Sequence, residues 1–165
     1  MILALDLSTK SSGWAVYDKN NLIASGCITA TSSDLIERII KITKELDEEI
    51  LKKYNIHEVI AEEVQPTGGY GVGNQKTHKA LMWIQASIAL LLHPYHIKFN
   101  FVYPNSWRSQ CGIKTGRGIT RETLKQKDIE FVKNKFNKNV NDDEADAICI
   151  GYAYTLSSAN EINFE

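Results

Sequence analysis

The stretch MILALDLSTKSSGWAV, residues 1–16, contains the strongest indication of the fold of this protein. Residues 2–7 form an apolar run typical of a β-strand, and a turn rich in Ser and Gly leads into a second run at residues 13–17. The first run contains one charged side chain, Asp6. Because an unpaired carboxylate is costly to bury among apolar side chains, Asp6 is expected to have a partner.

The pattern of short apolar runs and helical repeats continues along the chain. Residues 22–29 complete an antiparallel meander, and a capping-box pair, Asp34 and Glu37, opens a helix that is expected to end near Tyr54. The further elements expected are a strand at 58–63, a helix at 75–92, a strand at 98–103, a basic Gly-broken linker, a helix capped by Thr120 and a helix from Asn141 toward Leu156. This order predicts an α/β fold with a mixed five-stranded sheet, three antiparallel strands and then parallel strands, flanked by helices.

Length and composition limit the class of protein. A chain of 165 residues is expected to form a single domain, and 43% hydrophobic with 24% charged residues is typical of a folded protein. The most apolar stretch, 80–92, is too short to span a bilayer, so no membrane contact is expected. Three scattered cysteines argue against disulfides or a zinc site, and no secretory signal is visible, so a cytoplasmic location is expected.

Charge is unevenly distributed, although the net charge is only −1. Residues 105–140 contain nine Lys or Arg against three acids. This excess has two interpretations. It can form a surface that binds phosphate, or it can be an ordinary solvated helix face.

Acidic residues recur at the ends of predicted elements. Glu62 and Glu63 follow an apolar run, and only one of them can point to the same side of the sheet as Asp6, because strand side chains alternate. Asp143 and Asp146 are three residues apart, so they share one face of the last helix.

Helix capping explains only part of that last cluster. Asn141 and Glu144 match a capping box, and acids in a first turn suit the helix dipole. Asp146 lies beyond the cap, between two alanines, which indicates a ligand. Gathered carboxylates without His or Cys at ligand spacing favour Mg²⁺, with Mn²⁺ able to substitute. One or two such ions fit hydrolysis of a phosphodiester.

These residues together resemble the RuvC family of Holliday junction resolvases, and especially its phage-borne branch. The resemblance is carried by ALDLSTKSSGWAV, VIAEEVQ and DDEADAICIGYAY, and by shorter motifs at 105–108, 111–114 and 125–127. It spans almost the whole chain and implies a ribonuclease H-like fold and a metal-dependent nuclease that cuts four-way DNA junctions symmetrically as a homodimer.

Residue by residue, the resemblance implies functions for particular positions. It implies Asp6, Glu62, Asp143 and Asp146 as catalytic, metal-binding acids, and Lys125 as a catalytic lysine. The residues expected to bind DNA are Arg108, Lys114, Arg117, Arg121, Lys127, Tyr70 and Lys76.

Two further features bear on the resemblance. Helix 75–92 is apolar on nearly all sides in its second half, which favours a dimer interface there. An aromatic that the bacterial family carries after the strand-four acid is Gln65 here, and Tyr70 is a candidate substitute for stacking on a base.

Three competing interpretations remain open at this point. Residues 6–13, DLSTKSSG, also resemble the first phosphate loop of actin-like and sugar-kinase ATP-binding proteins, which need a second duplicated domain. A nuclease of the same fold that cuts flaps, replication forks or RNA–DNA hybrids is the second interpretation, and a non-catalytic binding module is the third. ATP binding and a comparison of DNA substrates distinguish them.

Overall fold

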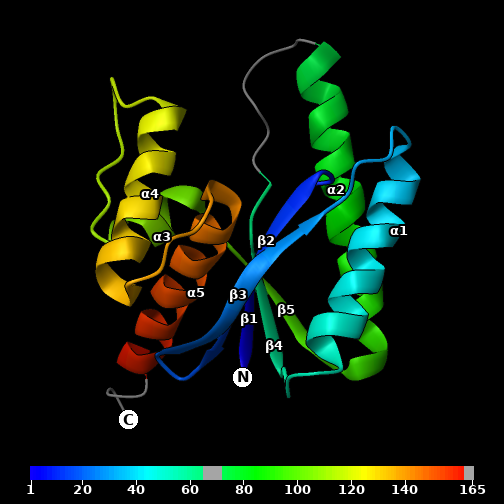
Figure 1. The fold of residues 1–165 in the computed structure, drawn as a ribbon, viewed down its shortest axis with the longest axis horizontal. Helices are drawn as coiled ribbons and strands as arrows, with labels where there is room; N and C mark the ends of the chain where they lie inside the picture. Colours follow the sequence, from blue (N-terminus) through cyan, green and yellow to red (C-terminus); the bar gives the residue numbers. More distant parts are fainter. Residues whose placement is uncertain (65–71, 162–165) are drawn as a thin grey trace.

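A five-stranded sheet with the order β3-β2-β1-β4-β5 forms the centre of the protein (Figure 1). The computed structural model describes residues 1–64 and 72–161. β1 pairs antiparallel with β2 and parallel with β4, β3 adds antiparallel to β2, and β5 adds parallel to β4. The strands are β1 (Ile2–Asp6), β2 (Ser11–Asp18), β3 (Asn21–Thr29), β4 (Glu58–Glu62) and β5 (Lys98–Val102). The predicted mixed sheet is therefore confirmed.

Helices cover both faces of the sheet, and each face has its own apolar core (Figure 1). The helices are α1 (Leu35–Leu46), α2 (Val72–Leu92), α3 (Pro104–Gln110), α4 (Arg121–Phe136) and α5 (Asp142–Glu161), with a π-helical turn at Asp47–Leu51 and a 3₁₀ turn at His93–Tyr95. α1 and α2 lie on one face, and α3, α4 and α5 lie on the other. None of the helices in the described ranges is long and apolar enough to cross a membrane.

The predicted helix caps are present. Asp34 accepts from the backbone N–H of Glu37 at 2.9 Å, and the Thr120 hydroxyl accepts from Thr123 N–H at 3.2 Å. Asn141 caps α5 through the N–H of Glu144 at 2.9 Å. The return half of that capping box does not form, because the Glu144 carboxylate accepts from Ser25 on β3 and from Lys138 instead.

One expected element is wrong. The segment after Pro104, expected to be a linker, forms α3 before the chain opens into a loop. Proline fits the first turn of a helix, where its missing N–H is not needed, and the fully buried Trp107 anchors α3 to the core. Smaller differences are at helix ends, since α2 begins at Val72 and α5 extends to Glu161.

Small residues let α5 pack closely on the sheet. Strand alternation directs Leu3 and Leu5 to the α1 and α2 core, and Ala4 and Ala15 to the core under α5. A Cβ on Gly13 of β2 would lie only 1.8 Å from the carbonyl oxygen of Asp143 at the start of α5. The absent side chain therefore allows α5 to begin directly beside the end of β1.

Candidate active site

Asp6 and Glu62 lie at the ends of neighbouring parallel strands. Asp6 is the last residue of β1 and Glu62 is the last of β4, one residue beyond the paired residues Leu5 and Ala61. Both side chains lie on the sheet face covered by α5, where they line one cavity. Glu63 has the opposite parity, and its backbone N–H donates to Val102 of β5. Strand alternation thus selects Glu62 over Glu63 as the neighbour of Asp6.

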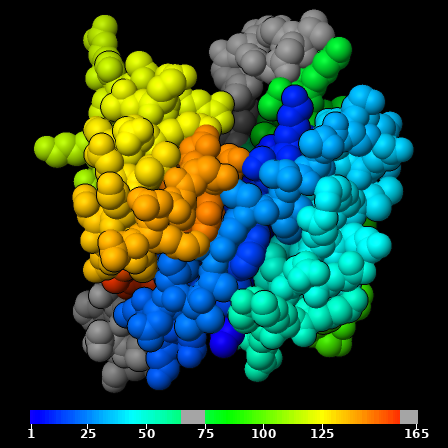
Figure 2. Space-filling view, viewed as in Figure 1, coloured from blue at the N-terminus to red at the C-terminus, as the bar shows by residue number. Residues whose placement is uncertain are grey.

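The first turns of α5 bring two more acids to the same cavity, which has a volume of about 190 Å³. Its lining residues are Asp6, Glu62, Arg108, Arg121, Leu124, Lys125, Asp143 and Asp146. The space-filling view shows the beginning of α5, in orange, packed between α4, in yellow, and the blue strands (Figure 2). All four acids expected to act together are therefore gathered, from three separate elements.

Crowding of these acids in a buried place changes their protonation. Burial, and then the negative charges of Glu62 and Asp143, raise the pKa of Asp6 to about 7. Burial, the charge of Asp6 and the adjacent Asp128 carboxyl raise the pKa of Asp146 to about 9. Burial also raises the pKa of Glu62. A positive group that entered the cavity would favour the ionised forms of all three.

Helix α3 supplies two contacts to these acids that the sequence did not predict. The indole Nε1 of Trp107 donates to Oε2 of Glu62 at 2.8 Å. The next residue, Arg108, places Nη2 at 3.4 Å from Oδ2 of Asp146, and its guanidinium carbon lies 4.0 Å from the centre of the Trp107 ring. Arg108 was expected at a DNA phosphate, and its ionic partners in this structure are carboxylates.

Asp128 of α4 is a fully buried acid. In the sequence it is one of three acids in a basic segment, and nothing singled it out there as a buried residue. Its Oδ2 accepts from Nε and Nη2 of Arg108 at 3.2 and 3.1 Å. The signal that could have revealed it was its spacing, because Leu124, Asp128 and Val132 are four residues apart and so share the apolar face of α4. A charge on a core-facing stripe indicates a buried partner.

The cavity offers ligand atoms for a metal ion, although not in a finished arrangement. Oδ1 of Asp146 and Oδ1 of Asp128 are buried without a hydrogen-bond partner. Within residues 1–64 and 72–161, no three acidic, His or Cys side chains are already arranged as the ligands of an ion. An unpartnered carboxylate oxygen and an all-oxygen donor set suit a hard cation such as Mg²⁺.

The remaining predicted basic residues lie in different places. Lys125 lines the cavity and forms an ion pair with Asp142, and this hydrogen bond raises the pKa of Lys125. Arg121 is exposed at the cavity rim, and Lys127 is half-buried on α4. Lys114 and Arg117 are exposed in the loop between α3 and α4. Tyr70 and Gln65 lie outside the described residues.

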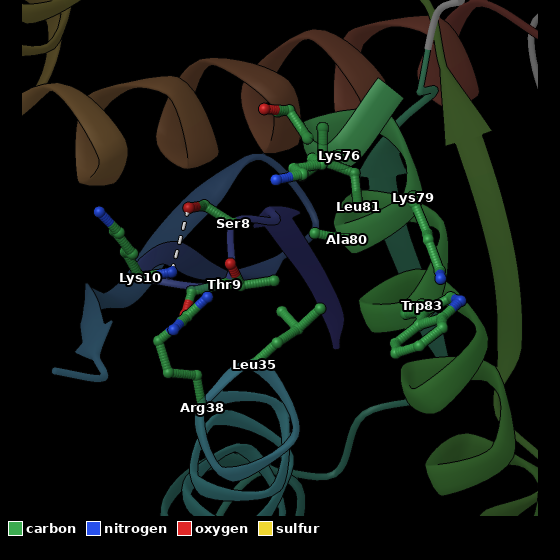
Figure 3. Close-up of a pocket in the computed structure, with 11 residues that line it drawn as sticks. Ser8, Thr9, Lys10, Leu35, Arg38, Lys76, Lys79, Ala80, Leu81 and Trp83 are labelled. Atoms are coloured by element: carbon green, nitrogen blue, oxygen red, sulfur yellow. Dashed lines mark hydrogen bonds between the residues drawn. The ribbon is translucent and has the colours of Figure 1, made fainter. Parts of the chain in front are cut away.

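Lys76 lies on the other face of the sheet, in a groove of about 550 Å³ formed by the β1–β2 turn, α1 and α2. Its charged lining residues are all basic: Lys10, Arg38, Lys76 and Lys79. Figure 3 shows the Lys76 side chain directed toward Ser8, whereas Lys79 runs beside Trp83, its ammonium 4.6 Å from the ring centre. The groove is therefore a second basic surface, separate from the carboxylates.

Comparison with known proteins relates this fold to solved structures. No family model and no curated protein matches the sequence. RuvC of T. thermophilus in complex with a Holliday junction substrate matches with a TM-score of 0.74 at 12% identity, over 96% of this chain and 94% of that chain.

Two further structures match over most of their length. The yeast mitochondrial Holliday junction resolvase matches with a TM-score of 0.65 at 12% identity, over 99% of this chain and 80% of that one. The fowlpox virus Holliday junction resolvase matches with a TM-score of 0.61 at 18% identity, over 95% and 98%. The chain therefore has the ribonuclease H-like fold of the RuvC-type Holliday junction resolvases.

Proposed function

We propose that this protein is a metal-dependent endonuclease that resolves four-way DNA junctions by paired, symmetric hydrolysis of phosphodiester bonds. The observation that carries the proposal is the convergence of Asp6, Glu62, Asp143 and Asp146 in one cavity. The fold adds support, because RuvC shares it and has been solved with a Holliday junction substrate.

The acids of the cavity are suited to one or two Mg²⁺ ions, with Mn²⁺ as a substitute. Asp6, Glu62, Asp143 and Asp146 would hold the metal, because all four line the same cavity. When bound, a divalent ion supplies activation of water and stabilisation of the negative charge on the phosphate. The raised pKa values of Asp6 and Asp146 support this proposal, because a bound cation would offset the repulsion between the crowded carboxylates.

Basic side chains at the cavity can bind and orient the scissile phosphate. Lys125 lines the cavity beside the carboxylates, and its contact with Asp142 keeps it protonated. Arg121 lines the same cavity. A fixed positive charge next to the reacting phosphate stabilises the charge that develops in the transition state.

Two basic surfaces can hold DNA away from the cavity. One is the loop between α3 and α4 with Lys114 and Arg117, and the second is the groove that contains Lys76. Lys127 lies on α4, the helix that follows this loop in the chain. Basic side chains therefore lie on both faces of the sheet. This placement suits a branched DNA whose arms extend in different directions.

A homodimer formed through α2 would supply two cavities for two symmetric cuts. Leu90 is 76% exposed, Met82 46% and Trp83 41%, and all three lie on α2. Phe101, on the edge strand β5, is also an exposed apolar residue. Exposed apolar residues gathered on one helix are typical of a protein interface.

The test is cleavage of matched DNA substrates. We expect a labelled four-way junction to receive paired symmetric nicks with Mg²⁺ or Mn²⁺, and EDTA to abolish them. A flap, a fork and a linear duplex of the same sequence are the controls. Equal cutting of all branched forms would show a general branched-DNA nuclease instead of a junction resolvase. Absence of cutting under all conditions would contradict the proposal.

A further inference from the structure

Arg108 contacts two buried acids at once, and one of them, Asp128, has no part in the proposed metal site. Nε and Nη2 of Arg108 lie 3.2 and 3.1 Å from Oδ2 of Asp128, and Nη2 lies 3.4 Å from Oδ2 of Asp146. The guanidinium also lies 4.0 Å from the centre of the Trp107 ring. The Arg108 side chain is 12% exposed and that of Asp128 is 0% exposed. Arg108 is thus confined between α3, α4 and α5.

Without a cation between them, these two acids would be difficult to bury. Asp128 and Asp146 each have an Oδ1 atom that is buried and accepts no hydrogen bond. Removing one partner of a buried ion pair leaves the second charge uncompensated, which is strongly destabilising. A single guanidinium contacts both carboxyl groups and offsets one negative charge, so Arg108 is the internal counter-ion of this pair.

We propose that Asp128 is a positioning residue that holds Arg108, and that this pair sets how readily a divalent cation binds at Asp146. The inference rests on the metal site of the proposed function. Arg108 competes with the metal for Asp146, and its two hydrogen bonds to Asp128 allow it to release Asp146 without losing all ionic contact. Without Asp128, the ionic partner left to Arg108 among these contacts is Asp146, and the competition is stronger.

Titration with Mn²⁺ by calorimetry tests this competition in four proteins: wild type, Asp128→Asn, Arg108→Gln and the double variant. We expect Asp128→Asn to weaken Mn²⁺ binding by about tenfold and Arg108→Gln to strengthen it severalfold. In the Arg108→Gln background, Asp128→Asn should weaken Mn²⁺ binding much less than it does in the wild type, because the larger part of its effect acts through Arg108. Glu130→Gln, which removes an exposed acid of the same helix, is the matched charge control.

Equal weakening by Asp128→Asn with and without Arg108 would overturn the proposal, since Asp128 would then act directly or through its charge alone. If Asp128→Asn does not fold, Arg108→Gln decides the matter alone, and unchanged or weaker Mn²⁺ binding overturns the proposal. Absence of Mn²⁺ binding in every protein, wild type included, would instead count against the proposed metal site itself.

Thermal unfolding in EDTA tests the pairing without any metal. We expect Arg108→Gln to lower the melting temperature. The double variant should lose less in melting temperature than the two single variants lose together, because the charge left unpaired by one substitution is removed by the second. Additive effects would show that Arg108 and Asp128 are not coupled.

Discussion

The indole nitrogen of Trp107 donates a 2.8 Å hydrogen bond to Oε2 of Glu62, and this contact ties α3 to the carboxylate at the end of β4. Burial raises the pKa of Glu62, and the Trp107 hydrogen bond lowers it in part. The indole therefore favours the ionised form of Glu62 and fixes the direction of one of its oxygens.

Trp107→Phe removes this hydrogen bond and keeps an aromatic ring in the core. We expect single-turnover cleavage of a four-way junction to fall about tenfold, because Glu62 loses its fixed orientation. Junction binding, measured by gel shift in EDTA, should not change. The control is Trp14→Phe, since Trp14 packs against the core on the α1 and α2 face of the sheet. Equal losses in the two variants would contradict the specific role of Trp107.

Asp6→Asn and Asp146→Asn each replace a carboxyl group of the cavity by an amide of nearly the same size. We expect either change to reduce cleavage by roughly a thousandfold or more, because the acids act as one unit. Junction binding should stay within about threefold of wild type, since the basic surfaces are unchanged. Cleavage at the wild-type rate by either variant would remove the assignment of these acids.

The stability of the metal-free protein should depend on pH. The pKa of Asp6 is about 7 and that of Asp146 about 9, both raised from 3.8. Between pH 3.8 and these values the folded state binds more protons than the unfolded state, so the free energy of unfolding should fall as pH rises.

Asp146→Asn provides the check on this slope. At pH 8 in EDTA we expect it to stabilise the protein by about 1–2 kcal/mol, because Asp146 must take up a proton when the wild type folds at that pH. At pH 4, close to the unfolded pKa of 3.8, little proton uptake is needed, so the substitution should have little effect. Thermal unfolding followed by circular dichroism measures both. A stability gain of the same size at both pH values would show that the charge of Asp146 is not its cause.

Gly13→Ala should disturb the start of α5. The added Cβ would lie 1.8 Å from the backbone oxygen of Asp143, so either α5 or β2 must move. We expect a loss of about 1–3 kcal/mol in unfolding free energy, together with weaker cleavage. Gly26→Ala is the comparison, because the atoms nearest to its Cβ would belong to the Trp14 side chain rather than to backbone, the nearest at 3.0 Å. A smaller effect at Gly13 than at Gly26 would contradict the packing described.

Leu90→Lys should weaken the proposed dimer. Leu90 is 76% exposed on α2, so a charge there is tolerated in a monomer but not in an apolar interface. We expect light scattering to show dimers for wild type and monomers for the variant. Ile23→Lys, at an exposed apolar position on β3 at the opposite sheet edge, should leave the dimer intact. A monomeric wild type would refute the dimer.

Most of the fold and the set of acids could be predicted from the sequence. Alternating apolar residues predicted the strands, and the caps at Asp34, Thr120 and Asn141 predicted the starts of three helices, because these signals depend on neighbours in the chain. The position of Asp6 in an apolar strand and of Asp146 beyond a helix cap marked them as unusual for the same reason. Their roles in catalysis, and the DNA contacts of Lys114 and Arg117, stay predictions.

Which side chains meet could be learned only from the tertiary structure. The helix that carries Trp107 and Arg108 is seven residues long, too short for a helical repeat to reveal it, and it is held by contacts with β4, α4 and α5. Asp128 looked like a surface acid in a basic segment, and its burial against Arg108 depends on a residue 20 positions away. Contacts between distant segments have no local sequence signal, because they arise when several elements pack around the same space.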